Sequence, residues 1–354
     1  MKVLSLTKYG RMGASSRMRS LQYQPYSAAA GYEVATNELI DDRMLSHRYQ
    51  NGRYSLGSLL YSYVNRFLAL LDRSNFDVLW IEKEALPWFP ASIELILLRG
   101  VPYVIDYDDA VFHSYDLHRS VAVRKLFGNR LDRLMAKAAL VTAGNKYLAK
   151  RAIDAGAKWV EVLPTVVDLE RYPRGSSASR GDVLRIVWIG SPSTAHYLTL
   201  LREPLKQLAF RYPFVLRVIG AKEVDIPGVD IEYVVWSENS EVDSISSCAI
   251  GIMPLVDSPW ERGKCGYKLI QYMACYLPVV ASPVGANVDI VDDGVNGFLV
   301  ASANDWVTAL SDLLQSSELR VAMGDAGRAR VEEKYCLQRT GPLLVELLRR
   351  VAEK

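Results

Sequence analysis

The stretch Leu184-Arg-Ile-Val-Trp-Ile-Gly190-Ser191-Pro-Ser193-Thr194 passes from a short hydrophobic strand, through a glycine turn, into a helix predicted over residues 195–211. Gly190 leaves room for a ligand beside the end of the strand. Ser193 or Thr194 is a suitable N-cap, whose hydroxyl and neighbouring amides can bind a phosphate. Helix capping alone is the alternative explanation for these hydroxyls. A strand followed closely by a helix is the repeating unit of a parallel α/β sheet.

The same unit recurs along the whole chain. Short hydrophobic runs alternate with amphipathic stretches, as expected where helices cover both faces of a parallel sheet. Strands are predicted over residues 3–7, 32–36, 78–81, 103–106, 140–142 and 160–163, and again over 184–189, 214–219, 231–235, 249–253, 279–281 and 298–300. Because 354 residues exceed what one core usually serves, we predict an α/β protein of two Rossmann-like doubly wound domains facing each other across a cleft.

A Gly/Ser-rich stretch from Tyr172 to Gly181 separates the two sets of strands. Such a composition is unsuited to a core and typical of an exposed linker. We therefore predict an N-terminal domain over residues 1–170, a linker over 171–183 and a C-terminal domain over 184–335. Helical spacing of the leucines near the end predicts a terminal helix over 336–354, packing back on the N-terminal domain.

The composition is that of an ordinary globular protein, with a net charge of +2. No run approaches the roughly 18 apolar residues of a membrane span, and the first residues read as a strand rather than a signal peptide, which predicts a cytoplasmic protein. Cys248, Cys265, Cys275 and Cys336 lack metal-ligand spacing and are predicted to be buried free thiols. No basic patch is dense enough to predict binding of nucleic acid.

A second glycine turn follows the first predicted strand, where Gly10 and Gly13 permit close approach of the backbone to an anion. The turn lacks the full G-x-G-x-x-G fingerprint, and no suitably placed acidic residue follows the second strand. Both absences argue against NAD. A tight turn flanked by solvated arginines is the alternative explanation.

The stretch from Pro254 to Ser282 carries the clearest cationic pattern, with Arg262, Lys264 and Lys268 among glycines directly after a buried strand. Lys264 and Lys268 are four residues apart. If both are helical, they lie on one face and place two ammonium groups near a diphosphate. A solvated surface is the alternative, but it would need no flanking glycines.

This part of the chain resembles the retaining glycosyltransferases of family 4, which have the GT-B fold. The resemblance rests on Lys268-Leu-Ile-Gln-Tyr-Met-Ala-Cys-Tyr-Leu-Pro-Val-Val-Ala-Ser282, Val284-Gly-Ala-Asn287, Ile290-Val-Asp-Asp-Gly-Val-Asn-Gly-Phe-Leu299 and Met323-Gly-Asp-Ala-Gly-Arg328. It covers the C-terminal domain well and the N-terminal domain loosely. The resemblance implies transfer of a sugar from a nucleotide diphosphate donor, bound mostly by the C-terminal domain, to an acceptor bound by the N-terminal domain.

The chain departs from that family at two carboxylates. Members commonly carry Glu-x7-Glu, in which one Glu contacts the donor sugar and the other the ribose, and the aligned positions here are Gly263 and Gln271. Gln271 can still hydrogen-bond a ribose hydroxyl, and Glu261 can reach the sugar from two residues earlier. Trp236 follows a predicted strand and is expected near the base. Arg262, Lys264 and Lys268 are expected to supply positive charge.

Three aspartates, Asp106, Asp108 and Asp109, end the fourth predicted strand. The resemblance aligns Asp108 roughly with a frequent histidine of the family, so these side chains are expected to bind acceptor hydroxyls or orient the reacting groups. Coordination of Mg²⁺ and simple turn formation are the alternatives. We predict neither a metal nor another cofactor, because lysines, arginines and helix N-termini neutralise the leaving diphosphate in this fold.

Together these features predict a glycosyltransferase that uses a UDP- or GDP-sugar and a glycan or lipid-linked acceptor, with retention implied by the resemblance. The predicted catalytic residues are Asp106, Asp108, Asp109, Lys264 and Lys268; the predicted donor-binding residues are Gly10, Gly13, Gly190, Ser191, Ser193, Thr194, Trp236, Glu261, Arg262, Gly263, Lys264, Lys268 and Gln271. A non-catalytic nucleotide-sugar-binding or scaffold protein and a sugar-nucleotide epimerase are the alternatives.

Residues 121–139 combine hydrophobic and basic side chains at helical spacing. Such a helix can lie on an anionic membrane, which would place the protein at the inner face of the membrane. A core-facing helix with a solvated basic side is the alternative.

Overall fold

The computed structural model describes residues 1–173, 183–222 and 224–353. The chain divides into two compact units. The first unit comprises Met1–Thr165, Gly263–Cys265 and Leu337–Lys354, and the second comprises Val166–Arg262 and Gly266–Cys336. Most of the predicted linker, residues 174–182, lies outside the described residues.

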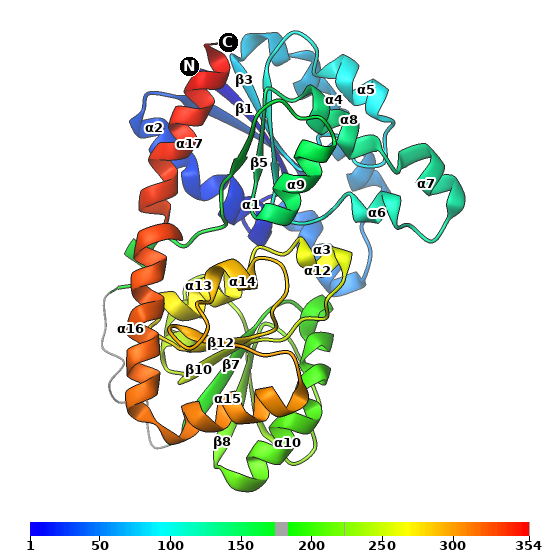
Figure 1. The fold of residues 1–354 in the computed structure, drawn as a ribbon. Coiled ribbons are helices and arrows are strands. Elements are labelled where there is room, and N and C mark those ends of the chain that lie inside the picture. The colour runs from blue at the N-terminus through cyan, green and yellow to red at the C-terminus, as the bar shows by residue number, and fades with distance from the viewer. Residues whose placement is uncertain (174–182, 223, 354) are drawn as a thin grey trace. The chain divides into compact units, whose positions relative to one another are not determined.

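The first unit is built on a parallel six-stranded sheet in the order β2-β1-β3-β4-β5-β6 (Figure 1). Its strands are β1 (Lys2–Tyr9), β2 (Glu33–Ile40), β3 (Val78–Glu82), β4 (Tyr103–Tyr107), β5 (Leu140–Ala143) and β6 (Val160–Val162). β3, β4 and β5 are buried along their whole length. Their near-continuous hydrophobic runs are what a parallel strand covered on both faces requires.

The second unit repeats this design in the order β12-β11-β10-β7-β8-β9, again with parallel pairing. Its strands are β7 (Leu184–Ile189), β8 (Phe214–Ile219), β9 (Asp230–Val234), β10 (Ile250–Met253), β11 (Val279–Ala281) and β12 (Gly297–Leu299). In each unit the strand order reverses beside the first strand, and the carboxyl ends of strands at such a switch point form the usual ligand site of a doubly wound sheet.

Helices surround each sheet. Those of the first unit are α1 (Ala14–Arg19), η1 (Leu21–Tyr23), α2 (Gln24–Ala29), α3 (Asp42–Asn51), α4 (Leu56–Leu71), η2 (Arg73–Asn75), α5 (Ala91–Leu97), α6 (His113–Asp116), α7 (Val121–Phe127), α8 (Arg130–Lys137), α9 (Lys146–Asp154) and α17 (Leu337–Ala352). Those of the second are η3 (Leu169–Arg171), η4 (Pro192–Leu201), α10 (Arg202–Arg211), α11 (Glu241–Ser246), α12 (Pro259–Arg262), α13 (Tyr267–Ala274), α14 (Asn287–Ile290), α15 (Ala303–Gln315) and α16 (Ser317–Lys334).

The two faces of the first sheet bury different side chains. Ile81 packs into a core with Leu134 of α8 and Leu148 of α9. Trp80 points to the opposite face, where the Tyr23 ring packs edge-on with centroids 6.3 Å apart. The final helix, α17, lies beside α2 on that second face (Figure 1). Its buried residues Leu344, Leu347, Leu348 and Val351 recur at helical spacing, so α17 completes the first unit.

The strands predicted from the sequence are all present, and 184–189, 214–219 and 279–281 have the predicted bounds. β2 extends four residues beyond its prediction of 32–36. β2 lies at the edge of the sheet and is mostly exposed. Polar residues such as Asn37 and Glu38 therefore interrupt the hydrophobic pattern from which strands were predicted.

Two helix predictions are wrong in detail. The helix expected over 195–211 is a 3-10 helix, η4, followed by α10, and the residue at the N-cap position is Ser191 rather than Ser193 or Thr194. The amphipathic segment 121–139 forms two helices, α7 and α8, instead of one. The break falls at Gly128, whose Cβ would lie 2.4 Å from the Arg124 carbonyl oxygen if the residue were not glycine.

Within the described residues, no helix has both the length and the hydrophobicity needed to cross a membrane.

Candidate functional site

Asp106, near the carboxyl end of β4, is fully engaged by buried partners in the first unit. Arg19 of α1 binds both its oxygens, with Nη2 2.6 Å from Oδ1 and Nε 2.9 Å from Oδ2. The Thr142 hydroxyl donates a third hydrogen bond to Oδ1, at 2.6 Å. Arg19 and Asp106 side chains are 1% and 2% exposed. Asp106 therefore anchors α1 to the sheet, and its carboxylate is not presented to a ligand.

Asp108, the first residue after β4, binds two different partners. Its Oδ1 is 2.8 Å from the Lys83 ammonium, and its Oδ2 accepts a 2.6 Å hydrogen bond from the Ser15 hydroxyl. Burial by itself raises the pKa of Asp108, but the Lys83 ammonium outweighs it and holds that pKa below the ordinary value. Asp108 is therefore a fixed anion over the physiological pH range.

Asp109 is the most accessible of the three aspartates, with its side chain 34% exposed. Lys264 lies opposite, with its ammonium 3.9 Å from Oδ1 of Asp109. Burial raises the pKa of Asp109 and the negative charge of Asp108 adds to this, while Lys264 opposes it. The two neighbouring aspartates thus have pKa values shifted in opposite directions, a pattern common where two carboxyl groups have different roles.

Lys264 reaches Asp109 because the short segment Gly263–Cys265 packs in the first unit. The Lys264 carbonyl oxygen accepts a 3.0 Å hydrogen bond from the Asn145 amide, and the Cys265 thiol is 3.1 Å from the carbonyl oxygen of Asp108. A Cβ at Gly263 would lie 2.4 Å from the Cβ of Ala110. Position 263 therefore has no room for a side chain.

The prediction that Lys264 and Lys268 share one helical face is wrong. α13 begins at Tyr267, and Gly266 before it has a left-handed backbone with φ +64. That conformation prevents the helix from continuing back to Lys264. Lys268, in the second unit, instead places its ammonium 4.2 Å from the centroid of the Trp188 ring.

Gly10 and Gly13 shape the first glycine turn rather than present free amides. The Gly10 amide donates to the Ile40 carbonyl at 3.0 Å, and the Gly13 amide donates to Gly10 at 3.1 Å. A Cβ on Gly13 would lie 2.3 Å from that of Tyr9. The turn brings Ser15 to Asp108, so these glycines act on the aspartates after β4 through packing, and their predicted contact with the donor stays a prediction.

Sequence reasoning missed Glu82, the last residue of β3, and Lys83, which follows it beside this cluster. Glu82 is 1% exposed, and its Oε2 accepts hydrogen bonds from the Ser16 hydroxyl at 2.5 Å and the Lys8 amide at 2.9 Å. Lys83 is also buried and has a left-handed backbone, with φ +63. The available signal was three adjacent charged residues directly after the hydrophobic run Val78–Ile81, at the carboxyl end of a central strand.

The second unit brings together three strand ends. Gly220 follows β8 with φ +83, and a Cβ there would lie 2.6 Å from the Gly190 carbonyl oxygen and 3.3 Å from Cβ of Trp236. Gly190 in turn is closed in by the Trp188 ring and by Thr194, whose Oγ1 would be 2.8 Å from an added Cβ. Gly190 and Trp236, predicted from the sequence, therefore do lie close together, and Gly220 is a further member that the sequence did not single out.

Polar groups surround this strand-end cluster. The exposed hydroxyls of Ser191 and Ser193 are 2.8 Å apart at the start of η4. The Trp236 indole N–H donates to Glu241 at 2.8 Å, and Glu241 also binds Arg171 at 2.9 Å. Because Glu241 is only 2% exposed, it fixes the orientation of the partly exposed Trp236 ring rather than meeting a ligand itself.

The remaining predicted residues of the second unit differ in accessibility. Arg262 is half exposed and binds Asp257 at 2.6 Å. Glu261 is buried and accepts hydrogen bonds from the Tyr197 and Ser258 hydroxyls. Gln271 is buried too, with its amide 3.1 Å from the Tyr172 hydroxyl. Glu261 and Gln271 thus serve packing here, and the sugar and ribose contacts expected of them stay predictions.

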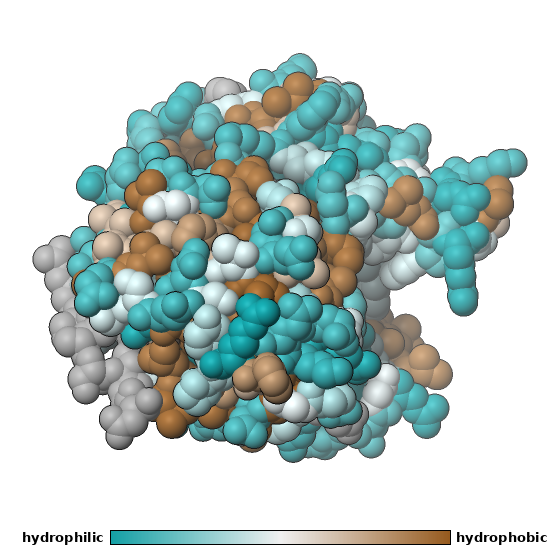
Figure 2. Space-filling view, turned by 60° about the horizontal axis from the view of Figure 1, so that its bottom comes forward, coloured by the Kyte–Doolittle hydropathy of each residue, from teal (hydrophilic) through white to brown (hydrophobic). Residues whose placement is uncertain are grey.

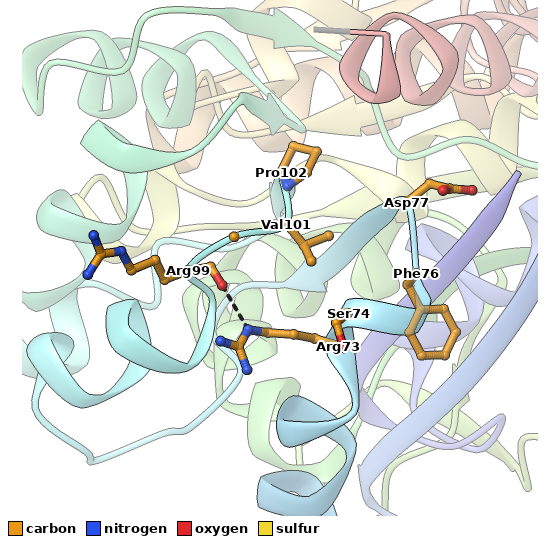
Figure 3. Close-up of a pocket in the computed structure, with 8 residues that line it drawn as sticks. Arg73, Ser74, Phe76, Asp77, Arg99, Val101 and Pro102 are labelled. Carbon is orange, nitrogen blue, oxygen red and sulfur yellow. Dashed lines mark hydrogen bonds between the residues drawn. The ribbon is translucent and has the colours of Figure 1, made fainter.

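Neither cluster has the character of a metal site: among the described residues, no group of three or more His, Cys, Asp or Glu side chains converges as metal ligands would. A hollow in the first unit is lined by Arg73, Ser74, Phe76, Asp77, Arg99, Gly100, Val101 and Pro102, where Arg73 donates to the Arg99 carbonyl at 2.9 Å (Figure 3). It lies at the amino ends of β3 and β4, opposite the edge at which such sheets bind ligands.

Proteins of known structure share this architecture. HepE from Anabaena, whose crystal structure holds UDP and glucose, superposes with a TM-score of 0.73 at 17% identity, covering 99% of this chain and 100% of HepE. Sucrose-phosphate synthase from Thermosynechococcus elongatus gives a TM-score of 0.75 at 15% identity, with 99% and 98% covered. These are GT-B proteins with two Rossmann-like domains, so the predicted fold class is confirmed.

Residues 184–316 match the family described as Glycosyl transferases group 1. Apart from residues 263–265, the matched segment lies within the second unit, and it covers less than half of the chain. The capsular polysaccharide biosynthesis glycosyltransferase CapM of Staphylococcus aureus is 28% identical over 134 residues, which is 36% of this chain and 35% of CapM. The chain spans between 11% and 35% of the length of the curated relatives it matches.

Proposed function

We propose that this protein is a glycosyltransferase that moves a sugar from a UDP- or GDP-sugar to a glycan or lipid-linked acceptor. One observation carries the proposal: the group 1 domain over residues 184–316 contains the cluster of Gly190, Gly220 and Trp236 at the carboxyl ends of β7, β8 and β9. This cluster suits a nucleotide diphosphate, because its glycines let a ligand approach the backbone and because it offers a fixed aromatic ring and exposed hydroxyls.

In this proposal the second unit binds the donor. Trp236 packs against the base, while Ser191, Ser193 and Thr194 hydrogen-bond the phosphates. Lys268 and Arg262 supply positive charge to the diphosphate as it leaves, and this charge stabilises the transition state more than the bound ground state. These cations make a metal unnecessary. The resemblance to family 4 supports retention of the anomeric configuration.

The acceptor binds in the first unit, where Asp109 faces Lys264 at 3.9 Å. A partly exposed carboxylate can accept a hydrogen bond from a sugar hydroxyl and orient it for attack. Asp108 supports it as a fixed neighbouring anion. Lys264 balances the negative charge of Asp109 and lies where it can meet an anionic group of either substrate.

We also propose that a membrane-bound acceptor is reached through α7 and the residues before it. Leu117, Val121 and Leu126 are 58%, 54% and 65% exposed, and each residue of α7 is at least partly exposed. Residues 117–129 hold three Lys or Arg and no Asp or Glu. Figure 2 shows this projecting part, at the right of the view, with hydrophobic and hydrophilic residues side by side. Such a surface suits the anionic inner face of a membrane.

The donor site is tested by titrating UDP, GDP and their sugars by calorimetry. Lys268→Ala is expected to weaken binding of the preferred nucleotide about tenfold, because it loses one charge-assisted contact. Lys206→Ala, at an exposed lysine of α10, is the matched control and leaves binding unchanged. If no nucleotide binds, or if both variants bind like the wild type, the donor site is wrong.

The reaction is tested by incubating the preferred donor with and without acceptor extracts. A new glycoside that forms only with acceptor supports transfer, and NMR of its anomeric centre tests retention. Donor binding without any product indicates the non-catalytic alternative, which the missing carboxylates at Gly263 and Gln271 favour. Conversion of the donor without acceptor indicates an epimerase.

A further inference from the structure

Lys83 has a backbone conformation that a lysine rarely adopts. Its φ is +63, in the left-handed region, and its amide donates to the carbonyl oxygen of Asp106 at 2.8 Å. A non-glycine residue in this region is strained and persists only where the surroundings hold it. Such residues concentrate at functional sites, so the contacts of the Lys83 side chain indicate why this backbone conformation is kept.

The Lys83 ammonium is buried where three separate segments of the first unit meet. It lies 2.8 Å from Oδ1 of Asp108, after β4, and donates to the Ser15 hydroxyl of α1 at 2.7 Å. It is also 3.7 Å from Oε1 of Glu82, an oxygen that is buried and makes no hydrogen bond. Lys83 is thus the cation that satisfies two buried carboxylates, and the left-handed backbone turns its side chain back toward them.

We propose that Lys83 is a positioning residue of the acceptor site: it fixes Asp108 as an anion in one orientation and so leaves Asp109 as the carboxylate that receives the acceptor hydroxyl. The inference rests on the proposed function. Both oxygens of Asp108 are occupied, by Lys83 and Ser15, and its side chain is 12% exposed. Asp109 is 34% exposed and faces only Lys264 at 3.9 Å among the described ion pairs. Lys83, 5% exposed, acts through Asp108 and not on the substrate.

Other charged groups surround the cluster on every side. Lys8 of β1 and Lys264 add positive charge, Arg19 of α1 lies behind Asp106, and Glu82 and Glu84 add negative charge. Without the Lys83 ammonium, Asp108 keeps its burial and loses its nearest cation. Its pKa then rises, because burial disfavours the charged carboxylate. A protonated Asp108 removes a negative neighbour that raises the pKa of Asp109, while the loss of the Lys83 ammonium acts on that pKa in the opposite direction.

The first experiment reads these carboxyl groups directly. Carboxyl-carbon NMR titration of the full chain, assigned with Asp108→Asn and Asp109→Asn, is made for the wild type, Lys83→Met and Lys83→Arg. We expect Lys83→Met to raise the titration midpoint of Asp108 by at least one pH unit and Lys83→Arg to restore most of the shift. Lys150→Met, at a surface lysine 2.8 Å from Asp154, is the control and leaves both midpoints unchanged. An unchanged Asp108 midpoint in Lys83→Met overturns the proposal.

The second experiment measures transfer. Lys83→Met is expected to lower kcat at least thirtyfold while the donor affinity of the second unit stays within twofold. In the Asp108→Asn background, Lys83→Met should have little further effect, because residues that act through one another are not additive. Independent, multiplying effects overturn the inference. If Lys83→Met does not fold, Ser15→Ala replaces it, since the Ser15 hydroxyl contacts both Lys83 and Asp108.

Failure of the two ideas is distinguishable. A wild-type protein that transfers nothing contradicts the proposed function, whereas the NMR titration still decides whether Lys83 controls Asp108. Transfer by a Lys83→Met protein at the wild-type rate, with the wild-type pH profile, contradicts the role of Lys83 alone.

Discussion

Asp106 and Asp109 lie three residues apart, yet the structure predicts opposite consequences for their replacement by asparagine. In Asp106→Asn, the buried Arg19 loses a carboxylate that it binds at 2.6 and 2.9 Å. Its remaining partners are neutral: the Leu163 carbonyl at 2.7 Å and the Thr165 hydroxyl at 3.3 Å. In Asp109→Asn, the partly exposed side chain loses only the 3.9 Å contact with Lys264.

The magnitudes follow from burial. Removing one partner of a buried ion pair typically costs about 3–5 kcal/mol, because the other charge stays desolvated. For a unit of this size each kcal/mol lowers Tm by about 2–4 °C, so Asp106→Asn should lower Tm by roughly 6–20 °C. Asp109→Asn removes a screened, partly exposed contact and should change the free energy of unfolding by less than about 0.5 kcal/mol. Its transfer rate should fall about 100-fold, as expected when a positioned carboxylate is lost.

The assay pairs thermal unfolding, followed by calorimetry, with the initial rate of sugar transfer. Asp154→Asn, at an exposed aspartate that binds Lys150 on the surface, is the control and should leave both quantities unchanged. Donor affinity should stay at the wild-type value in Asp109→Asn, because the residues proposed to bind the donor belong to the other unit. A wild-type Tm for Asp106→Asn, or a full transfer rate for Asp109→Asn, would refute the division of roles.

Three further predictions concern the strand-end glycine, the buried arginine and the pH profile. In Gly220→Ala, at φ +83, the new Cβ would lie 2.6 Å from the Gly190 carbonyl oxygen, so calorimetry should show at least tenfold weaker nucleotide binding. Gly228→Ala is the control, because Gly228 has a similar φ of +81 but open space around it, and this variant should bind the nucleotide normally. Arg130→Met leaves the buried Glu84 and Glu94 without their shared cation and should cost about 3–5 kcal/mol in urea unfolding at pH 7. That loss should shrink on acidification, because burial raises the pKa of Glu94 and its protonation removes the uncompensated charge. Burial likewise raises the pKa of Asp109, so the transfer rate should fall with decreasing pH at a higher midpoint than an ordinary aspartate gives, and Asp109→Asn should abolish that limb; a limb unaltered by this variant would assign it to another group.

The fold was predictable because its central strands are buried on both faces. β7 and β8 are hydrophobic runs interrupted by a single arginine each, and their bounds could be read from the sequence. β2 alternates polar residues at an exposed edge, so its end could not. The 3-10 geometry of η4 depends on packing of Tyr197, Leu198 and Leu201, for which periodicity over a single stretch carries no signal.

The residues of the candidate sites could be predicted only where they directly follow a predicted strand. Gly190 and Trp236 follow strands, and the structure brings them together around Gly220. The Asp-Tyr-Asp-Asp sequence identified the right loop, but it could not show that Asp106 and Asp109 differ. Asp106 is bound by Arg19 of α1, whereas Asp109 faces Lys264. Lys83 was missed because its partner Asp108 is 25 residues away in sequence, and only the pairing of β3 with β4 brings the two loops together.

The two positions that the family resemblance aligns with glutamates, Gly263 and Gln271, both pack against neighbouring residues. Gly263 lies against Ala110, where even a Cβ would be 2.4 Å from a neighbouring carbon, and the Gln271 amide is held by Tyr172 in the core of the second unit. A carboxylate at position 263 would have to displace Ala110, and the side chain at position 271 is buried. Any donor contact must therefore come from residues that are still accessible, and Arg262, Lys268 and the hydroxyls of η4 are cationic or neutral. A donor site built this way attracts the diphosphate more strongly than the sugar, so its discrimination should depend mainly on the nucleotide.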